Sequence, residues 1–228
     1  WSLFENYPLD CFLDVAEVQK AVSVNGQLEA CPVWKRFYEI GTPESLEEFR
    51  ACAGKRFGEK RPAVFLDRDG VINEIVYNED TEELESPLKP EQFVFLDRVP
   101  EALSTIRKKG YYIFIVTNQP AAAKGKTTLG RLYDVNRHMQ ERLLERHCGA
   151  DGIFMCPHSE KRTAHTKETF LNRRCGCRKP ETGLLQGALE TYHIDLQRSW
   201  MAGDSHTDIL AGQRVGVRTG LIGDLKCD

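Results

Sequence analysis

From Pro62 onward, short apolar runs alternate with amphipathic segments, and this alternation constrains the fold more than any other feature of the sequence. It is typical of an α/β domain, in which helices cover both faces of a parallel sheet and the buried strands read as continuous apolar runs. Five such runs are short and bounded by turn residues, so we predict that they are strands. They span residues 63–66, 111–116, 152–155, 199–202 and 217–222.

Three segments between these runs carry apolar residues at helical spacing. Pro100 is favourable near the start of the first helix, and Gly110 is expected to end it. We expect all three apolar faces to pack on the sheet. They comprise Ala102, Leu103 and Ile106 in the first helix, Leu132, Val135, Met139 and Leu143 in the second, and Leu185, Ala188, Leu189 and Tyr192 in the third.

A polar stretch at residues 53–61 predicts a linker between a short N-terminal piece, residues 1–52, and the α/β domain, residues 62–228. A chain of 228 residues with 41% hydrophobic content can bury the core of one such domain beside a smaller piece. Residues 77–91 are acidic and contain prolines, and we interpret them as a solvated flap and not as part of a site.

The net charge of −3, with 29% charged residues, gives no sign of a nucleic-acid-binding surface or a disordered tail. No apolar run approaches the roughly 20 residues of a membrane span, and the first residues lack the pattern of a signal peptide. We therefore expect a globular protein of the cytoplasm that acts on neither nucleic acid nor membranes. Because the chain starts with Trp1 instead of methionine, we expect a fragment of a longer protein.

Two aspartates, Asp67 and Asp69, follow the first predicted strand directly, in the string FLDRDGVIN. In α/β folds ligands bind at the carboxyl edge of the sheet, which is where these side chains would lie. Two neighbouring carboxylates repel each other unless a cation lies between them, so the pair indicates Mg²⁺. Similar strings also occur in calcium loops and ordinary turns, so the pair alone does not decide between these interpretations.

Later strand ends supply further polar groups. Each has an ordinary structural explanation on its own: a loop cap for Thr117 and Asn118, a solvated charge for Lys179, and a helix cap for Asp208. Together they suit phosphoryl transfer, which needs an in-line nucleophile, positive charge near the phosphoryl oxygens and a proton for the leaving group. The strings are VTNQ with Thr117 and Asn118, CRKP with Lys179, and GDSHTD with Asp204 and Asp208.

The strings FLDRDGVIN, VTNQ, RKP and GDSHTD resemble the four motifs of the haloacid dehalogenase (HAD) phosphatases, and the resemblance covers residues 62 to about 222. It implies a Rossmann-like α/β fold with a parallel central sheet. It also implies that Asp67 attacks phosphorus and forms an aspartyl-phosphate, while Asp69 protonates the leaving oxygen and later activates water. Mg²⁺ would be held by Asp67, the backbone carbonyl of Asp69, and Asp204.

The same resemblance implies roles for the remaining motif residues. Thr117 and Lys179 would bind the transferring phosphoryl group, and Asn118 would position the leaving group. Asp208 would orient other groups of the site. One departure from the family pattern is Ser205, where many relatives carry lysine, so that one positive charge near the metal is missing.

Residues 156–180 form a long polar connection of a kind that usually carries a function or a metal. Cys156 and His158 form one close pair in it, and Cys175 and Cys177 form a second. Two such pairs suit a tetrahedral structural Zn²⁺ site in a reducing compartment. With four protein ligands this metal would support structure and not catalysis; the alternative is that these are ordinary buried cysteines.

The combination CPH … CGCRKP after VTNQ resembles the zinc-containing branch of the superfamily, the D-glycero-D-manno-heptose 1,7-bisphosphate phosphatases and the histidinol-phosphate phosphatases. Members lack a large cap domain, and the segments between the motifs are too short for one here. Pro120, Ala121 and Ala122 depart from the serine and glycine that the heptose enzymes typically have after TNQ. Basic residues on nearby loops could hold a second phosphate, and Arg178, next to Lys179, is the first candidate.

The N-terminal piece contains FYEIGTPESLEEF, which is similar to the closing segment of sugar-1-phosphate nucleotidyltransferases. The alternative is an ordinary strand and turn that lead into an amphipathic helix, with Thr42 and Pro43 as its start signal. The resemblance implies that residues 1–52 end a transferase domain and that the phosphatase is fused to, or works with, a nucleotidyltransferase. This piece lacks a glycine-rich nucleotide loop, so it would not transfer a nucleotide itself.

We therefore expect an Mg²⁺-dependent hydrolase of a small sugar phosphate, which removes the 7-phosphate from D-glycero-D-manno-heptose 1,7-bisphosphate. Histidinol phosphate is the alternative substrate. A hypothesis of another class is a catalytically silent, zinc-stabilised partner module of a nucleotidyltransferase, although paired carboxylates would have no purpose in such a module. A nucleic-acid end phosphatase would need a long basic groove with interleaved aromatic residues, which the sequence does not contain.

Overall fold

The computed structural model describes residues 14–28, 38–78, 82–161 and 163–226. The chain divides into two compact units, Trp1–Glu47 and Glu48–Asp228. None of the helices among the described residues is long and apolar enough to cross a membrane.

Two helices belong to the N-terminal part of the chain: α1 (Val15–Val24) and α2 (Pro43–Phe57). The predicted start signal is confirmed, because α2 begins at Pro43 and the Oγ1 of Thr42 accepts a hydrogen bond from the N–H of Ser45 at 3.2 Å. The helix continues to Phe57, so residues 53–57 of the predicted linker are helical. The N–H of His193 donates to the carbonyl of Lys55 at 2.9 Å, which explains why the end of α2 belongs to the second unit.

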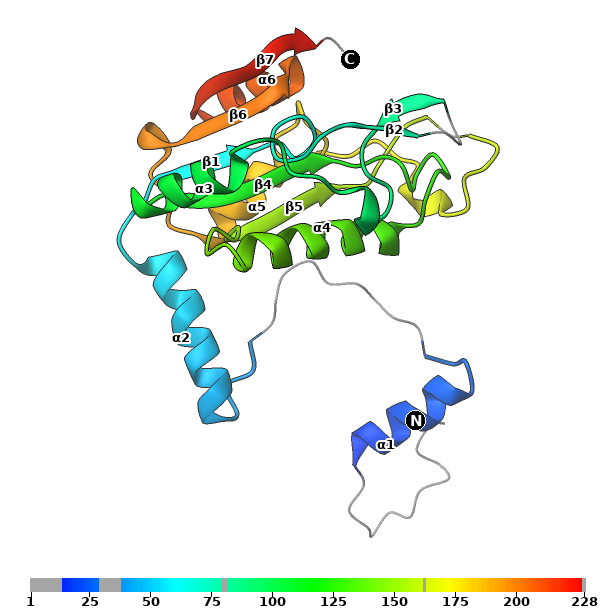
Figure 1. Ribbon diagram of the computed structural model, residues 1–228. Coiled ribbons are helices and arrows are strands. Elements are labelled where there is room, and N and C mark those ends of the chain that lie inside the picture. Colours follow the sequence, from blue (N-terminus) through cyan, green and yellow to red (C-terminus); the bar gives the residue numbers. More distant parts are fainter. Residues whose placement is uncertain (1–13, 29–37, 79–81, 162, 227–228) are drawn as a thin grey trace. The chain divides into compact units, whose positions relative to one another are not determined.

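The second unit contains a five-stranded parallel sheet with the strand order β5-β4-β1-β6-β7 (Figure 1). All five predicted strands are present. The structure extends four of them toward their carboxyl ends. In β4 and β6 this extension places Thr117, Asn118 and Asp204 within strands and not in the loops that follow. The strands are β1 (Ala63–Leu66), β4 (Tyr112–Asn118), β5 (Gly152–Cys156), β6 (Trp200–Ser205) and β7 (Arg218–Lys226).

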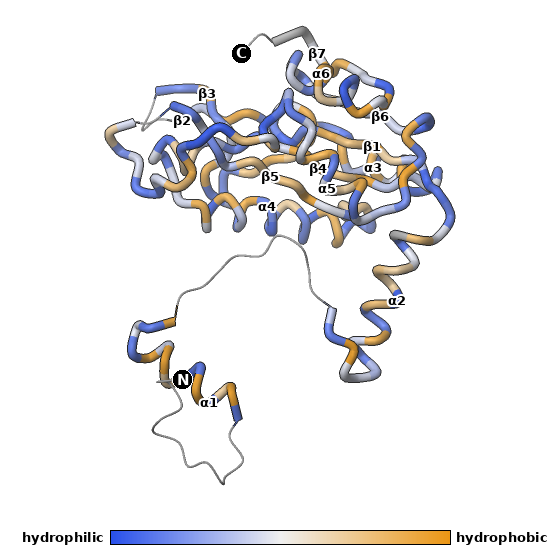
Figure 2. The backbone as a smooth tube through the Cα atoms, turned by 180° about the vertical axis from the view of Figure 1, so that it is seen from behind, coloured by the Kyte–Doolittle hydropathy of each residue, from blue (hydrophilic) through white to orange (hydrophobic). Residues whose placement is uncertain are grey.

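Helices cover both faces of this sheet because successive strand residues point to opposite sides. Ala63 and Phe65 belong to the core cluster that includes α5 (Gly183–Thr191) and α6 (His206–Val215). Val64 and Leu66 belong to the cluster that includes α3 (Val99–Lys108) and α4 (Leu129–Leu144). Figure 2 shows strands β4 and β5 largely in the colour of hydrophobic residues, as expected for strands covered on both sides.

Aromatic packing fixes the centre of the sheet. Phe65 and Phe114 are fully buried and stack with 5.3 Å between ring centroids. Tyr192, after α5, packs edge-on against Phe114 at 4.8 Å, and its hydroxyl donates to the carbonyl of Asp151 at 2.6 Å. Burial of each phenylalanine contributes about 2–3 kcal/mol, so strand β1, which leads into the two aspartates, is firmly held.

Between β1 and α3 the chain forms a small antiparallel hairpin of β2 (Val76–Asn78) and β3 (Glu83–Glu85), in which Val76 pairs with Glu85. A short 3-10 helix, η2 (Pro90–Gln92), follows the hairpin. Two further 3-10 helices are η3 (Thr169–Leu171) and η4 (Leu196–Arg198). The residues interpreted as a flap are therefore an ordered hairpin, described except for residues 79–81.

Strand order decides where a ligand can bind. The chain runs from β1 outward to β4 and β5, then crosses to β6 on the other side of β1. In such sheets, ligands bind at the carboxyl ends of the strands beside the point where the order reverses. The ends of β1, β4 and β6 therefore frame the candidate site.

We predict that Gly212→Ala destabilises the α/β unit. A Cβ at Gly212 would lie 2.7 Å from the Cβ of Met201 on β6 and 2.7 Å from the Cγ2 of Thr219 on β7. Overpacking of this kind costs about 1–3 kcal/mol, more than the ~1 kcal/mol that alanine gains in a helix. Thermal denaturation should give a lower melting temperature.

Gly130→Ala, in helix α4, is the matched control, because the nearest atom to its added Cβ would be 3.9 Å away. This variant should melt no lower than the unaltered protein. Equal melting temperatures for the two variants would contradict the close approach of α6 to the sheet.

Candidate active site

Three carboxylates meet at the carboxyl edge of the sheet. Asp67, Asp204 and Asp208 each offer an oxygen, and these oxygens lie within 4.8 Å of one another. Asp67 directly follows β1, and its N–H donates to the carbonyl of Ala202 on β6 at 3.0 Å. Asp204 lies in β6 and Asp208 in the first turn of α6. Oxygen ligands so arranged can hold a hard divalent cation.

Asp208 combines a structural and an electrostatic role. Its Oδ2 accepts a hydrogen bond from the N–H of Ser205 at 3.1 Å, and the Oγ of Ser205 accepts from the N–H of Thr207 at 3.1 Å, which forms a capping box for α6. A Cβ at Gly203 would lie 2.2 Å from the carboxyl carbon of Asp208, so only glycine fits there. The predicted helix cap is present, and Ser205 itself is the N-cap residue.

Lys179 is the centre of the charge arrangement. Its side chain is buried, and its Nζ lies 2.9 Å from Oδ1 of Asp67 and 2.6 Å from Oδ1 of Asp208. The Nζ also donates to the carbonyl of Val116 at 2.8 Å. Burial would lower the pKa of Lys179, but the two carboxylates outweigh it and hold that pKa above its usual value. The predicted alternative of a solvated lysine is therefore wrong.

Burial dominates the titration of Asp67. Removal from water raises the pKa of Asp67 to about 6, helped by the negative charges of Asp208 and Asp69, although Lys179 opposes the shift. A pKa of about 6 leaves the Asp67 carboxylate mostly ionised at neutral pH, and a bound cation would lower that pKa.

Asp69 points to a different set of partners. The Nη2 of Arg68 lies 3.1 Å from its Oδ1, Nδ2 of Asn73 donates to the same oxygen at 3.0 Å, and the hydroxyl of Ser86 donates to Oδ2 at 2.8 Å. The amide of Gln119 also donates to Oδ2. Burial alone would raise the pKa of Asp69, but Arg68 and these hydrogen bonds outweigh it and hold the pKa below its usual range.

Thr117 and Asn118 lie where β4 ends. Thr117 is buried, and its Oγ1 accepts a hydrogen bond from Nε2 of Gln119 at 2.8 Å, so Gln119 joins Thr117 to Asp69. The side chain of Asn118 binds the backbone of Lys179 in both directions, at 3.0 Å to its N–H and 3.1 Å to its carbonyl. Asn118 therefore fixes the segment that carries the buried lysine.

A cavity of about 530 Å³ opens above these groups. Asp67, Asp69, Asn118, Lys179 and Asp204 line it, so the structure brings most of the predicted site residues to one space. Its outer wall is basic: Lys124, Lys126, Lys161 and Arg178 line it as well.

The hairpin and the residue after it also line this cavity, through Glu83, Leu84, Glu85 and Ser86. The interpretation that the flap lies outside the site is therefore wrong. Its acidic composition has a local explanation, because the Nζ of Lys126 pairs with Glu83 at 2.6 Å and with Glu85. This double ion pair joins the hairpin to the loop after β4.

A second cluster lies in the connection after β5. The Sγ of Cys177 is 3.2 Å from the Sγ of Cys156 and 3.3 Å from the Sγ of Cys175, and the Nδ1 of His158 is 3.3 Å from the Sγ of Cys177. Four ligands about 2.3 Å from one tetrahedral ion would lie about 3.8 Å apart, so the predicted set is arranged around one centre. The hydrogen bond between Cys177 and Cys156 lowers the pKa of Cys177 to about 5, which favours the thiolate that metals bind.

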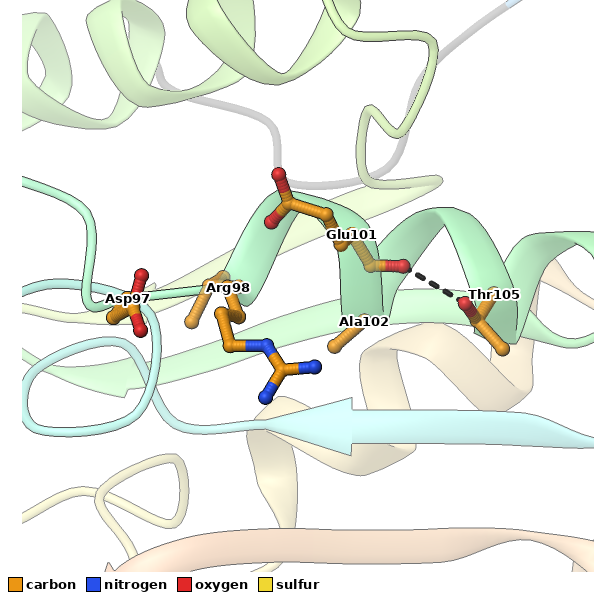
Figure 3. Close-up of a pocket in the computed structure, with 6 residues that line it drawn as sticks. Asp97, Arg98, Glu101, Ala102 and Thr105 are labelled. Atoms are coloured by element: carbon orange, nitrogen blue, oxygen red, sulfur yellow. Dashed lines mark hydrogen bonds between the residues drawn. The ribbon is translucent and has the colours of Figure 1, made fainter.

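Another hollow, of about 430 Å³, lies at the start of α3 and is lined by Asp97, Arg98, Glu101 and Thr105 among others (Figure 3). The hydroxyl of Thr105 donates to the carbonyl of Glu101 at 2.9 Å, an ordinary contact within a helix. The four side chains are exposed and do not converge on one point. This hollow is not a candidate active site.

Sequence reasoning missed Arg68, Asn73, Ser86 and Gln119 as parts of the site. Arg68 and Gln119 directly adjoin motif residues, which was the only signal available for them. Ser86 lies 17 positions from Asp69 and reaches it only through the hairpin. No periodicity or spacing in the sequence could have indicated that contact.

Known proteins share this architecture. A family model described as "HAD-hyrolase-like" matches residues 176–224. The D-glycero-beta-D-manno-heptose-1,7-bisphosphate 7-phosphatase of Salmonella typhi is 38% identical over 165 residues, which cover 70% of this chain and 81% of that protein. The protein of the same name from Vibrio cholerae serotype O1 is 35% identical over 164 residues, covering 71% and 81%.

A solved structure, that of D,D-heptose 1.7-bisphosphate phosphatase from B. bronchiseptica complexed with magnesium and phosphate, is also similar. Its TM-score is 0.57 at 26% identity, and the match covers 70% of this chain and 79% of that one. Identity above 30% across most of a relative's length, together with a shared parallel sheet, establishes common descent. The chain belongs to the HAD-like hydrolases and is a phosphatase of that family.

Proposed function

We propose that this phosphatase removes the 7-phosphate from D-glycero-D-manno-heptose 1,7-bisphosphate, through an aspartyl-phosphate on Asp67 and with Mg²⁺. The substrate assignment rests on the group of cations that line the same cavity as Asp67. A bisphosphate needs one cationic site for the phosphate that reacts and another for the phosphate that stays. Relatives at 35–38% identity carry the name of this activity.

Asp67 and Asp204, with the backbone carbonyl of Asp69, would hold the Mg²⁺ ion. The carboxylate of Asp208 is already engaged by Lys179 and by the N–H of Ser205, so it fits an orienting role better than a ligand role. Bound there, Mg²⁺ would neutralise charge on the phosphoryl oxygens and hold phosphorus in line with Asp67.

Asp67 would then attack phosphorus and displace the sugar oxygen, which takes a proton from Asp69. In the free protein its neighbours keep Asp69 ionised. A phosphate dianion brought beside it raises the pKa of Asp69, so that Asp69 takes up a proton as substrate binds. Once the sugar has left, the ionised Asp69 can remove a proton from the water that attacks the aspartyl-phosphate.

Lys179 would stabilise the transferring phosphoryl group, since its Nζ lies 2.9 Å from the nucleophilic carboxylate. Thr117, whose hydroxyl accepts a hydrogen bond from Gln119, would help to bind the transferring phosphoryl group. Asn118 would act by holding the Lys179 backbone next to the leaving group.

The second phosphate would bind to Lys124, Lys161 and Arg178. Among the described residues, no ion pair joins these three cations to a carboxylate, whereas Lys126 is paired with the hairpin. Burial lowers the pKa of Lys124, and so do the positive charges of Lys126, Arg178 and Lys161. Crowded cations are stabilised by an anion, as expected of a phosphate site.

Histidinol phosphate is the competing substrate. It carries one phosphate and a positively charged amine, which three unpaired cations would repel. The hypothesis of a silent partner module has less support, because Asp67, Asp69, Asp204 and Lys179 converge in one cavity. We also infer, from the string at residues 37–49, fusion to a nucleotidyltransferase that consumes the sugar 1-phosphate.

We also propose that Cys156, His158, Cys175 and Cys177 bind one structural Zn²⁺, which would fix the loop that leads to Arg178 and Lys179. Three sulfur ligands and one nitrogen suit Zn²⁺ better than a hard cation. Thiols of this kind stay reduced in the cytoplasm, where we place the protein.

Asp67→Asn should lower the rate of phosphate release by at least about a thousandfold, because an amide cannot serve as the nucleophile. Stability should not fall, since burial already disfavours the charge of Asp67. The matched control is Asp97→Asn, an exposed carboxylate outside the cavity, which should keep full activity. Comparable activity in Asp67→Asn would exclude the covalent mechanism.

Protein purified without chelators should contain about one zinc ion per chain, measured by elemental analysis. Cys175→Ser should lose the zinc and lower the melting temperature, because metal binding contributes to folding. Cys52→Ser is the control: this half-buried cysteine lies outside the cluster, and the variant should retain zinc. A zinc-free wild-type protein would refute the assignment.

The heptose bisphosphate should have a higher kcat/KM than histidinol phosphate. Lys161→Met should raise the KM for the bisphosphate about threefold to tenfold and leave that for p-nitrophenyl phosphate unchanged. Lys167→Met, an exposed lysine that does not line the cavity, is the matched control. A preference for histidinol phosphate would overturn the substrate and leave the phosphatase chemistry intact.

A further inference from the structure

A buried arginine lies directly behind the two aspartates of the site. Arg68 is fully buried and stands between Asp67 and Asp69 in the chain. Its Nε lies 3.2 Å and its Nη2 3.1 Å from Oδ1 of Asp69, and Nη2 is also 3.2 Å from Oδ2. The guanidinium thus holds the carboxylate in a forked contact, which fixes its orientation as well as its position.

The far side of this guanidinium is held by a residue distant in sequence. The Nη1 of Arg68 donates to Oδ1 of Asn136 at 2.8 Å. Asn136 lies in the middle of α4 and is itself only 5% exposed. Its Nδ2 is 3.4 Å from the sulfur of Met155 on β5. A buried asparagine in a helix interior is unfavourable for the helix, so this contact indicates a purpose beyond packing.

The other donors to Asp69 come from less regular segments. Asn73 lies in the turn after β1, Ser86 follows the hairpin strand β3, and Gln119 lies in the loop that leaves β4. Arg68 alone among these donors is braced by a helix of the layer that covers the sheet. The brace thus connects the Asp69 carboxylate to helix α4 through Arg68.

We propose that Asn136 is a positioning residue, which acts through Arg68 to keep the Asp69 carboxylate in line with the leaving oxygen of the substrate. This inference rests on the proposed role of Asp69 as the group that protonates the leaving oxygen. Without the acceptor on Asn136, one arm of the guanidinium has no partner in a buried place, and Arg68 must rotate toward another one. Asp69 then moves with it, because the two share a forked contact.

The test compares two classes of substrate. A sugar oxygen is a strongly basic leaving group that needs the proton of Asp69, whereas p-nitrophenolate leaves readily without one. Asn136→Leu should lower kcat/KM for the heptose bisphosphate at least tenfold and that for p-nitrophenyl phosphate less than twofold. Since kcat/KM covers only the steps up to formation of the aspartyl-phosphate, slower hydrolysis of that intermediate does not affect the comparison.

Two variants separate positioning from general loss of structure. Asn136→Asp keeps an oxygen acceptor for Arg68 in either protonation state, so it should retain the wild-type ratio of the two kcat/KM values. Met139→Ala leaves a cavity about one turn further along α4, at a buried residue of the core cluster that also contains Val64 and Leu66. It should lower the melting temperature without changing that ratio.

An unchanged ratio in Asn136→Leu, or an equal fall with both substrates, would overturn the inference. A shift of the ratio in Met139→Ala as large as in Asn136→Leu would overturn it too. If the wild-type protein prefers histidinol phosphate, the same comparison is made with that ester in place of the bisphosphate, because its leaving oxygen is equally basic. A wrong substrate assignment would thus appear in the kcat/KM values of the wild-type protein. A wrong role for Asn136 would appear only in how its variants change the ratio of kcat/KM for the two substrates.

Discussion

The buried ammonium group of Lys179 is the interaction on which the rest of the site depends. Asp67 and Asp208 are brought close to each other and to Asp204, which would be strongly unfavourable without a cation among them. Lys179 supplies that charge permanently, and Asn118 holds its backbone in place. Loss of Lys179 would leave buried carboxylates uncompensated, which typically costs about 3–5 kcal/mol.

The pKa values of Asp67 and Asp69 are shifted in opposite directions by their surroundings. Asp67 shares Lys179 with Asp208, and burial prevails, so its pKa rises to about 6. Asp69 has Arg68 and three hydrogen-bond donors of its own, so its pKa falls. Two carboxylates only two residues apart thus differ in pKa because their surroundings differ.

Three peripheral segments close around this centre, and each has its own local stabilisation. Glu83 and Glu85 of the hairpin pair with Lys126. The cysteines and the histidine of the connection after β5 cluster together. Helix α6 begins at the capping box of Ser205 and Asp208. The cations that remain unpaired face the cavity between them. Segments held independently of the substrate can present a preformed anion site, which lowers the entropic cost of binding a bisphosphate.

The sequence by itself determined the five strands, their burial and the motif residues at their ends, because apolar runs and residues adjacent to them are local signals. The sequence also indicated the four candidate metal ligands, three cysteines and one histidine, because they lie in close pairs along the chain. Only the tertiary structure decided that the acidic flap lines the cavity, that Lys179 is buried between two aspartates, and that Arg68 is braced by Asn136, 68 positions away. These contacts join segments that strand order and helix packing bring together, which local sequence signals do not report. The sequence also does not show whether the partner of a charged residue is water or a buried carboxylate.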